Sequence, residues 1–132
     1  MHRFRRASFK NWITPQASNK MLQIFYFNQA QILQAESHRF IWKIAAETST
    51  GADKIKAGLP ADTWFAHKTG SSGVNKKGLT SAENDIGIIR LPNGTPLFIS
   101  VLLTNSTESP TTNKHIIAQI AEIIWQNHQI FN

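Results

Sequence analysis

At 132 residues, with 41% hydrophobic and 17% charged side chains, the chain has the composition of a folded globular domain rather than of a disordered segment. It contains no cysteine, which excludes disulfide frameworks, thiolate zinc sites and cysteine nucleophiles. The formal net charge is +6, and residues 1–10 are strongly basic, but no apolar run follows them, so no signal peptide is expected in this chain.

The pattern of the first half of the chain is helical. Thr14-Pro15 offers a capping hydroxyl followed by proline at the first helical position, and apolar residues recur at helical intervals up to about Leu33. A second helix is predicted to begin near Ala35 and to end in the turn residues 48–51. Residues 52–59 are expected to form a further short helical turn. The buried side of the second helix is predicted to carry Phe40, Ile41 and Ile44.

Beyond residue 60 the pattern changes to that of strands. Strands are predicted at Thr63–His67, Asp85–Leu91 and Leu97–Thr104, and the Pro-Asn-Gly-Thr turn between the last two predicts a hairpin. The third strand is almost wholly apolar, which favours burial on both of its faces. After a loop at 106–112, a closing helix with isoleucines along one side is predicted from Asn113 onward.

Helices, then antiparallel strands, then a helix is the element order of an α+β fold. The expected architecture has three antiparallel strands, the second and third as a hairpin, with the N-terminal helices and a C-terminal helix packed on the sheet. No run of residues reaches the length and apolarity of a membrane-spanning helix, so no membrane partner is expected.

One tripeptide carries chemistry. Lys68-Thr69-Gly70 follows the first predicted strand and is extended by Ser71-Ser72-Gly73. Three common residues recur by chance, so the tripeptide by itself is more simply explained by a surface lysine. The motifs around it make it informative.

Several ordered motifs resemble those of class A serine β-lactamases, in the subgroup that has His before Lys-Thr-Gly. The motifs that carry the resemblance are Asn11–Pro15, Phe40–Lys43, Ser49–Gly51, Leu59-Pro60, Phe65–Gly73, Gly78–Thr80, Asn84–Ile88 and Leu91–Gly94. The resemblance runs from about Asn11 to about Trp125. It implies that residues 11–132 are the C-terminal part of a β-lactamase/transpeptidase-like domain, with residues 1–10 as a basic segment outside the family pattern.

The resemblance implies a substrate-binding role for the strand after His67, which itself is expected to be structural. Lys68 would direct its ammonium toward the carboxylate of a β-lactam, and the hydroxyls of Thr69 and Ser71 would donate hydrogen bonds to that carboxylate. The backbone N–H of Ser71 would be one of two donors in an oxyanion hole. Gly70 would let the substrate lie against the strand edge.

Two further positions follow from the same resemblance. Thr50 falls on a loop that borders the carboxylate pocket. Lys54 falls near a position where several family members carry a supporting arginine, and a lysine keeps that charge without the bidentate fork. No cofactor and no metal site are expected, because the histidines are scattered and have no companion carboxylates.

The reactive groups of the family are missing from this sequence. No serine is followed three residues later by lysine, no Ser-Asp-Asn occurs, and no glutamate is followed four residues later by asparagine. In the family these elements precede the region present here. The expected partners are therefore a β-lactam and a missing N-terminal half, and the chain alone is expected to be inactive and prone to self-association. The full-length family protein would be periplasmic or secreted.

Two alternatives stay open at the level of sequence. A fragment of a penicillin-binding D,D-peptidase would share the fold and the Lys-Thr-Gly strand, although Gly78-Leu79-Thr80 and Asn84–Ile88 favour the lactamase. A non-catalytic basic binding module would use residues 1–10, but a solvated terminus is the simpler explanation, so no nucleic-acid partner is expected.

Overall fold

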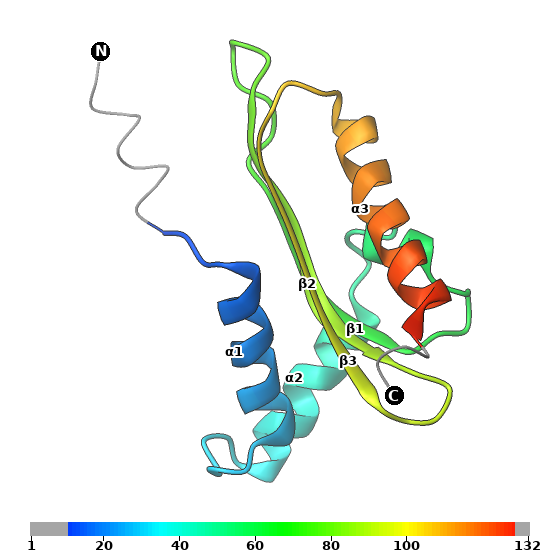
Figure 1. The fold of residues 1–132 in the computed structure, drawn as a ribbon. Helices are drawn as coiled ribbons and strands as arrows, with labels where there is room; N and C mark the ends of the chain where they lie inside the picture. Colours follow the sequence, from blue (N-terminus) through cyan, green and yellow to red (C-terminus); the bar gives the residue numbers. More distant parts are fainter. Residues whose placement is uncertain (1–10, 129–132) are drawn as a thin grey trace.

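The computed structural model describes residues 11–128, so the basic segment at 1–10 lies outside the described residues. The strands form one antiparallel sheet in the order β1-β2-β3. In Figure 1, two helices lie on one side of this sheet, and a third helix lies on the other. The α+β architecture predicted from the sequence is confirmed. The elements are α1 (Pro15–Phe27), α2 (Ala35–Glu47), the short 3-10 helix η1 (Ile55–Gly58), β1 (Phe65–Ser71), β2 (Thr80–Arg90), β3 (Pro96–Ser106) and α3 (Pro110–Gln126).

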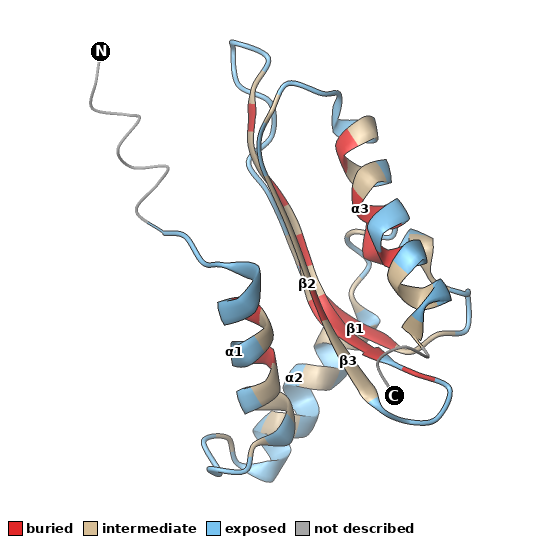
Figure 2. Ribbon diagram, viewed as in Figure 1, coloured by how far each residue is buried: buried red, intermediate tan, exposed pale blue. Residues whose placement is uncertain are grey.

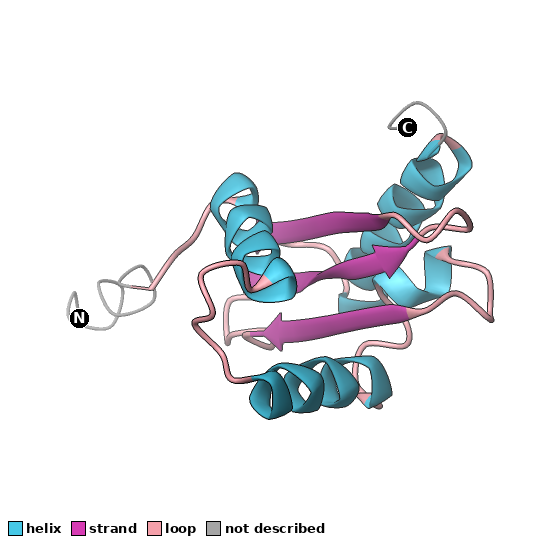
Figure 3. Cartoon of the chain, turned by 90° about the horizontal axis from the view of Figure 1, so that it is seen from below, coloured by secondary structure: helices cyan, strands magenta, loops and turns pink. Residues whose placement is uncertain are grey.

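The sheet leaves β1 and β3 as its two outer strands. β2 pairs along its whole length with β3, which forms the predicted hairpin, and residues Glu83 to Ile89 of β2 pair with β1. The hairpin turn needs a left-handed residue, and Gly94 supplies it with φ +86°. Figure 3 shows α2 beside β1 and α1 across β3, in agreement with the contacts between these elements.

The main hydrophobic core lies between the sheet and α3. Ile55 of η1 and Ile117 of α3 are both fully buried, and they pack with apolar side chains from all three strands. Figure 2 shows buried residues along the side of α3 that faces the sheet and along the strands. Burial of each such side chain contributes about 1.5–3 kcal/mol. The core cluster consists of Ile55, Phe65, Ile89, Leu91, Ile99, Ile117 and Ala121.

Helix α1 begins where the sequence predicts but ends earlier. The hydroxyl of Thr14 accepts a hydrogen bond from the N–H of Ala17, and proline occupies the first turn. The helix ends at Phe27 rather than near Leu33, because Asn28 adopts a left-handed conformation with φ 48°. The side chain of Asn28 donates to the carbonyl of Leu33 and accepts from its N–H, which fixes the residues between them as a loop.

The predicted buried side of α2 is wrong. Phe40, Ile41 and Ile44 are 61%, 40% and 53% exposed, and α2 has no fully buried residue. The opposite side of the helix packs instead, and the ring of Trp42 meets the ring of Tyr26 edge-on at 5.7 Å. The helical period is right, but α2 carries apolar residues on both sides, so the period alone does not say which side meets the sheet.

The strands and the last helix extend further than the sequence pattern. β1 runs through the whole Lys-Thr-Gly-Ser segment instead of ending at His67, and β2 begins at Thr80 instead of Asp85. Pairing between neighbouring strands holds these polar residues in extended conformation. β3 is mostly half-buried, with only Ile99 fully buried, so the prediction of burial on both faces is wrong. Helix α3 begins at Pro110 rather than Asn113, after a capping serine.

Candidate functional site

The Lys-Thr-Gly segment lies on an outer strand of the sheet. β2 pairs with one side of β1, and among residues 11–128 no strand pairs with its other side. The N–H of Ser72 donates to the carbonyl of Ala82 in β2. Because successive residues of a paired strand alternate in direction, the N–H of Ser71 points away from β2, toward the unpaired edge. Lys68 is exposed, and its ammonium donates to the carbonyl of Thr69 at 2.5 Å.

The loop between α2 and η1 brings Thr50 to this strand. The hydroxyls of Thr50 and Thr69 are 3.2 Å apart. The next residue, Gly51, has φ +72°, and a Cβ at this position would lie 2.3 Å from Cγ2 of Thr69. Only glycine lets the loop approach β1 so closely, so Gly51 is what seats Thr50 beside the Lys-Thr-Gly segment.

Lys54 lies under the strand rather than on its exposed side. It is 4% exposed, and its Nζ lies 2.5 Å from Oε1 of Glu83 and donates to the carbonyl of Asn84 at 3.1 Å and that of Gly70 at 3.5 Å. The other carboxylate oxygen of Glu83 accepts a hydrogen bond from the hydroxyl of Ser71 at 2.8 Å. Glu83 therefore neutralises the buried Lys54 and holds one of the predicted substrate-binding hydroxyls.

Sequence reasoning missed Glu83. The sequence pattern predicts a strand that begins at Asp85 and so places Glu83 in a loop, whereas β2 pairs Glu83 directly with Ser71. The available signal was the alternation of Glu83 and Asp85 immediately before an apolar run, since residues two apart share one face of a strand. Both acids are buried, at 2% and 0% exposure.

Asp85 forms a second buried pair next to the first. Its carboxylate lies 2.8 Å from Nδ1 of His67 and accepts a hydrogen bond from the N–H of Ile55 at 3.2 Å. The ring of His67 also packs on the ring of Phe65, with centroids 4.4 Å apart. This arrangement ties η1, β1 and β2 together, which agrees with a structural role for the histidine that precedes Lys68.

The loop before η1 is also tied to α3. The ammonium of Lys114 donates to the carboxylate of Asp53 at 2.7 Å. This hydrogen bond holds the pKa of Asp53 below its ordinary value, and it raises the pKa of Lys114. The ion pair is partly exposed, so it orients the loop without contributing much free energy.

Residues 11–128 contain no cluster of three or more histidine, aspartate or glutamate side chains that could hold a metal ion. Within the same range, no helix combines the length and apolarity needed to cross a membrane. Two shallow pockets, of about 280 and 270 Å³, are lined by residues outside β1.

The comparisons with known proteins agree on one family. A sequence model of the β-lactamase enzyme family matches residues 1–128. The β-lactamase VEB-1 of Pseudomonas aeruginosa is 47% identical over 125 residues, which is 95% of this chain and 42% of that protein. The extended-spectrum β-lactamase PER-1 of the same organism is 42% identical over 126 residues, 96% of this chain and 40% of that protein.

Solved structures lead to the same result. The TLA-1 extended-spectrum β-lactamase has a TM-score of 0.88 and 43% identity, over 96% of this chain and 45% of that one. A class A β-lactamase from Bacteroides cellulosilyticus has a TM-score of 0.84 and 36% identity, over 95% and 46%. The chain thus spans less than half the length of these relatives. Its sequence and its fold both show that the chain belongs to the β-lactamase enzyme family, and that its relatives are class A members.

Proposed function

We propose that β1 is the substrate-binding strand of a class A β-lactamase, and that it takes the carboxylate of a β-lactam against its unpaired edge. The observation that carries the proposal is the Lys68-Thr69-Gly70-Ser71 segment on an outer strand, where all but the half-buried Thr69 are exposed, with Thr50 beside it. Lys68 supplies the positive charge for the carboxylate, and the hydroxyls of Thr69 and Thr50 supply hydrogen bonds.

The backbone of Ser71 has a separate role in this proposal. Its N–H points to the unpaired edge and donates to the oxyanion that forms when the β-lactam carbonyl is attacked. One such donor contributes about 2.7–4 kcal/mol to stabilisation of the transition state. The hydroxyl of Ser71 is already engaged with Glu83, so it reaches the substrate carboxylate only if that hydrogen bond opens.

Gly70 supports the approach of a ligand to this edge. A Cβ built at Gly70 meets no atom of the chain within 4 Å, so packing inside the chain does not explain the glycine. A small residue there keeps the strand edge accessible. Lys54, by contrast, is buried beneath the strand, where Glu83 neutralises its charge. Its role in this proposal is to support β1, and it does not contact the substrate carboxylate directly.

Hydrolysis needs groups that this sequence does not contain. The nucleophilic serine of Ser-x-x-Lys, the Ser-Asp-Asn motif and the glutamate that activates water would come from the N-terminal half of the fold. With that half in place, the protein would hydrolyse β-lactams through an acyl-enzyme, in the periplasm or outside the cell. Without it, the chain binds a β-lactam weakly and turns none over.

Weak binding by the chain itself can be tested by NMR. Millimolar benzylpenicillin is expected to shift the amide signals of Lys68–Gly73 and Thr50 in a ¹⁵N-labelled sample, and Lys68→Ala is expected to abolish these shifts. Lys76→Ala removes another exposed lysine, in the β1–β2 connection, and is expected to leave the shifts unchanged. Shifts that survive Lys68→Ala, or that acetate reproduces at the same concentration, would contradict the proposal.

A further inference from the structure

One buried carboxylate lies directly beside the candidate binding strand. Oε2 of Glu83 accepts a hydrogen bond from the hydroxyl of Ser71 at 2.8 Å. A serine hydroxyl has a single hydrogen, so this bond leaves Ser71 with none to donate to another acceptor. The same oxygen of Ser71 accepts a hydrogen bond from the N–H of Gly73 at 3.2 Å. The side chain of Ser71 therefore presents a lone pair, and no proton, to a ligand on the strand.

The buried ammonium of Lys54 is committed in the same way. Its three N–H groups have three acceptors close by: Oε1 of Glu83 at 2.5 Å, and the carbonyls of Asn84 and Gly70 at 3.1 and 3.5 Å. The carboxylate of Glu83 cancels the charge of Lys54 at contact distance. Lys54 therefore has neither a free proton nor a net charge to offer to a ligand carboxylate.

A ligand carboxylate at Ser71 would also lie close to the charge of Glu83. An oxygen within hydrogen-bonding distance of the hydroxyl of Ser71 lies less than about 6 Å from Oε2 of Glu83, because both oxygens contact the same hydroxyl. Two like charges at this distance repel, and burial of Glu83 reduces the screening by water. Glu83 thus occupies the hydrogen bond that a ligand carboxylate would take.

The other groups of the site are not engaged by an acid in this way. The ammonium of Lys68 is exposed and donates to the carbonyl of Thr69. The hydroxyl of Thr69 lies 3.2 Å from that of Thr50. These groups can turn toward a ligand carboxylate without breaking an ion pair. Lys68 therefore meets the carboxylate without help from Lys54.

We propose that Glu83 is a specificity-determining residue, which lowers the affinity of β1 for the carboxylate of a β-lactam and so reduces the preference for the acid over a neutral ester of the same compound. The inference rests on the proposed function, because it concerns the same carboxylate site. Its physical basis is competition for the proton of Ser71, together with repulsion between two carboxylates beside one hydroxyl.

The test compares benzylpenicillin with its methyl ester, which keeps the ring system but carries no charge. Dissociation constants are measured by titration of the ¹⁵N-labelled chain, followed at the amide signals of Lys68–Gly73. In the parent chain the acid is expected to bind less than about tenfold tighter than the ester, because the exposed ammonium of Lys68 is the charge that distinguishes them. A larger preference for the acid in the parent chain would overturn the proposal.

Glu83→Leu/Lys54→Met removes both buried charges and leaves the hydroxyl of Ser71 free. Replacing a buried ion pair by apolar side chains is often neutral for stability, so this variant is expected to fold, as circular dichroism would check. The preference for the acid over the ester is expected to rise at least about threefold, because the freed hydroxyl donates to the carboxylate. A purely structural role of Glu83 would change stability but not this preference, and that result would overturn the proposal.

Glu83→Gln is a second variant with a different charge balance. It leaves the positive charge of Lys54 beneath the strand without a counter-charge, so the preference for the acid is again expected to rise. Benzylpenicillin is expected to raise the unfolding midpoint of this variant more than the ester does, because a ligand that binds the folded chain more tightly stabilises it more. Equal effects of the acid and the ester would count against a role of Glu83 in specificity.

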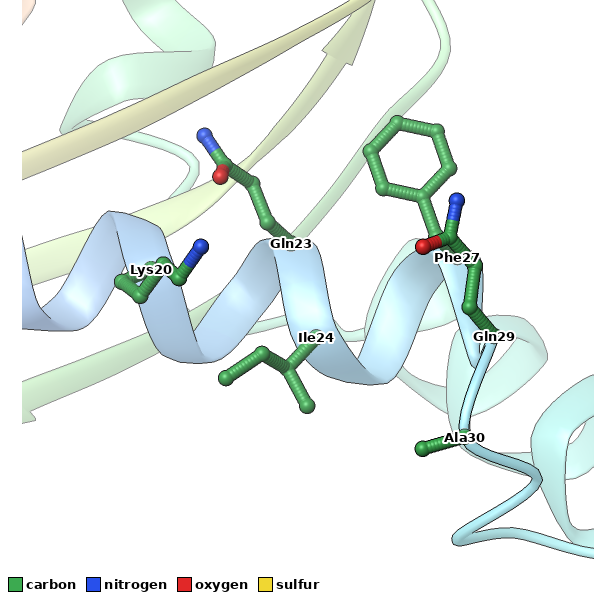
Figure 4. A pocket seen from close by; sticks show the side chains of 6 residues that line it. All are labelled: Lys20, Gln23, Ile24, Phe27, Gln29 and Ala30. Atoms are coloured by element: carbon green, nitrogen blue, oxygen red, sulfur yellow. The ribbon is translucent and has the colours of Figure 1, made fainter.

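A control excludes binding elsewhere on the chain. A shallow pocket of about 280 Å³ lies along α1 and the turn that follows it. Figure 4 shows Lys20 on the same stretch of helix as Ile24 and Phe27, two apolar residues of this pocket. Lys20→Gln removes one exposed positive charge and is expected to leave both dissociation constants unchanged. Weaker binding of the acid by Lys20→Gln would place the carboxylate on α1 and overturn the proposal.

The role of Glu83 and the proposed function fail in different ways. Shifts that disappear in Lys68→Ala, together with an unchanged preference in Glu83→Leu/Lys54→Met, would mean that β1 binds the carboxylate and that Glu83 does not tune it. That result contradicts the role of Glu83 alone. A parent chain that binds neither compound at β1 contradicts both proposals.

Discussion

At the scale of single residues, the main unexpected feature is the pairing of Lys54 with Glu83. Both side chains are almost fully buried, and their charged atoms are 2.5 Å apart. The carboxylate of Glu83 also accepts a hydrogen bond from the hydroxyl of Ser71. One buried acid therefore contacts both Lys54 and a residue of the candidate substrate-binding strand β1. A buried charge that loses its partner is costly, which makes this pair sensitive to substitution.

Glu83→Gln is expected to destabilise the chain by about 3–5 kcal/mol, because it leaves the ammonium of Lys54 buried without a counter-charge. Urea unfolding followed by tryptophan fluorescence would measure the change. The double variant Glu83→Gln/Lys54→Met is expected to recover part of the loss. Glu47→Gln breaks the exposed pair with Lys43 and is expected to change stability by less than about 0.5 kcal/mol. Equal effects of Glu83→Gln and Glu47→Gln would show that burial does not matter at Glu83.

Gly70→Ala is expected to leave the free energy of unfolding almost unchanged, because no atom of the chain lies within 4 Å of the new Cβ. The benzylpenicillin-induced shifts in the NMR spectrum are nevertheless expected to weaken. Gly87→Ala is the contrasting variant, since its Cβ would lie 2.5 Å from the carbonyl oxygen of Ala66 in β1. It is expected to lower the unfolding midpoint clearly. A large loss of stability in Gly70→Ala would mean that the glycine serves packing rather than ligand access.

At the scale of elements, α3 and the sheet form the part of the molecule that is complete by itself. Ile117 is fully buried in the middle of α3, in contact with the core that η1 and the three strands share. Ile123 lies on the same helix but is 60% exposed. The two isoleucines belong to the same apolar stripe in the sequence, and only their surroundings distinguish them.

Ile117→Ala is expected to cost about 2–5 kcal/mol, because it removes buried methyl groups and leaves a cavity. Ile123→Ala is expected to cost less than about 1 kcal/mol, since its side chain remains largely in water. Thermal or urea unfolding of the two variants, side by side, would measure the difference. Similar losses would indicate that α3 does not pack as described.

At the scale of the whole molecule, the chain is a layered fold in which α3 covers a fully buried core on one side of the sheet, while α1 and α2 lie on the other side with few buried residues. It carries a candidate binding strand but no serine in the Ser-x-x-Lys arrangement. The purified chain alone is therefore expected to hydrolyse nitrocefin no faster than buffer does, at any pH. A clear rate above buffer that Lys68→Ala reduces would contradict this and would require a nucleophile among the residues present.

Much of this could be predicted from local sequence. The family motifs, the α+β element order, the start of α1 at Thr14-Pro15 and the hairpin all depend on residues close together in the chain, whose propensities and spacing act locally. The sequence by itself also shows that the Ser-x-x-Lys and Ser-Asp-Asn motifs are absent from this chain, as is a glutamate followed four residues later by asparagine. These features can be predicted because each depends on fewer than about twenty consecutive residues.

Only the tertiary structure decided which side of α2 meets the sheet, how far β1 and β2 extend, and that Glu83 holds both Lys54 and Ser71. Each of these depends on contacts between segments distant in sequence, such as the register that sets Glu83 opposite Ser71. A helix with apolar residues on both sides satisfies the sequence pattern in either orientation. Contacts with the neighbouring elements decide between the two orientations. A pattern of consecutive residues does not say which elements those neighbours are.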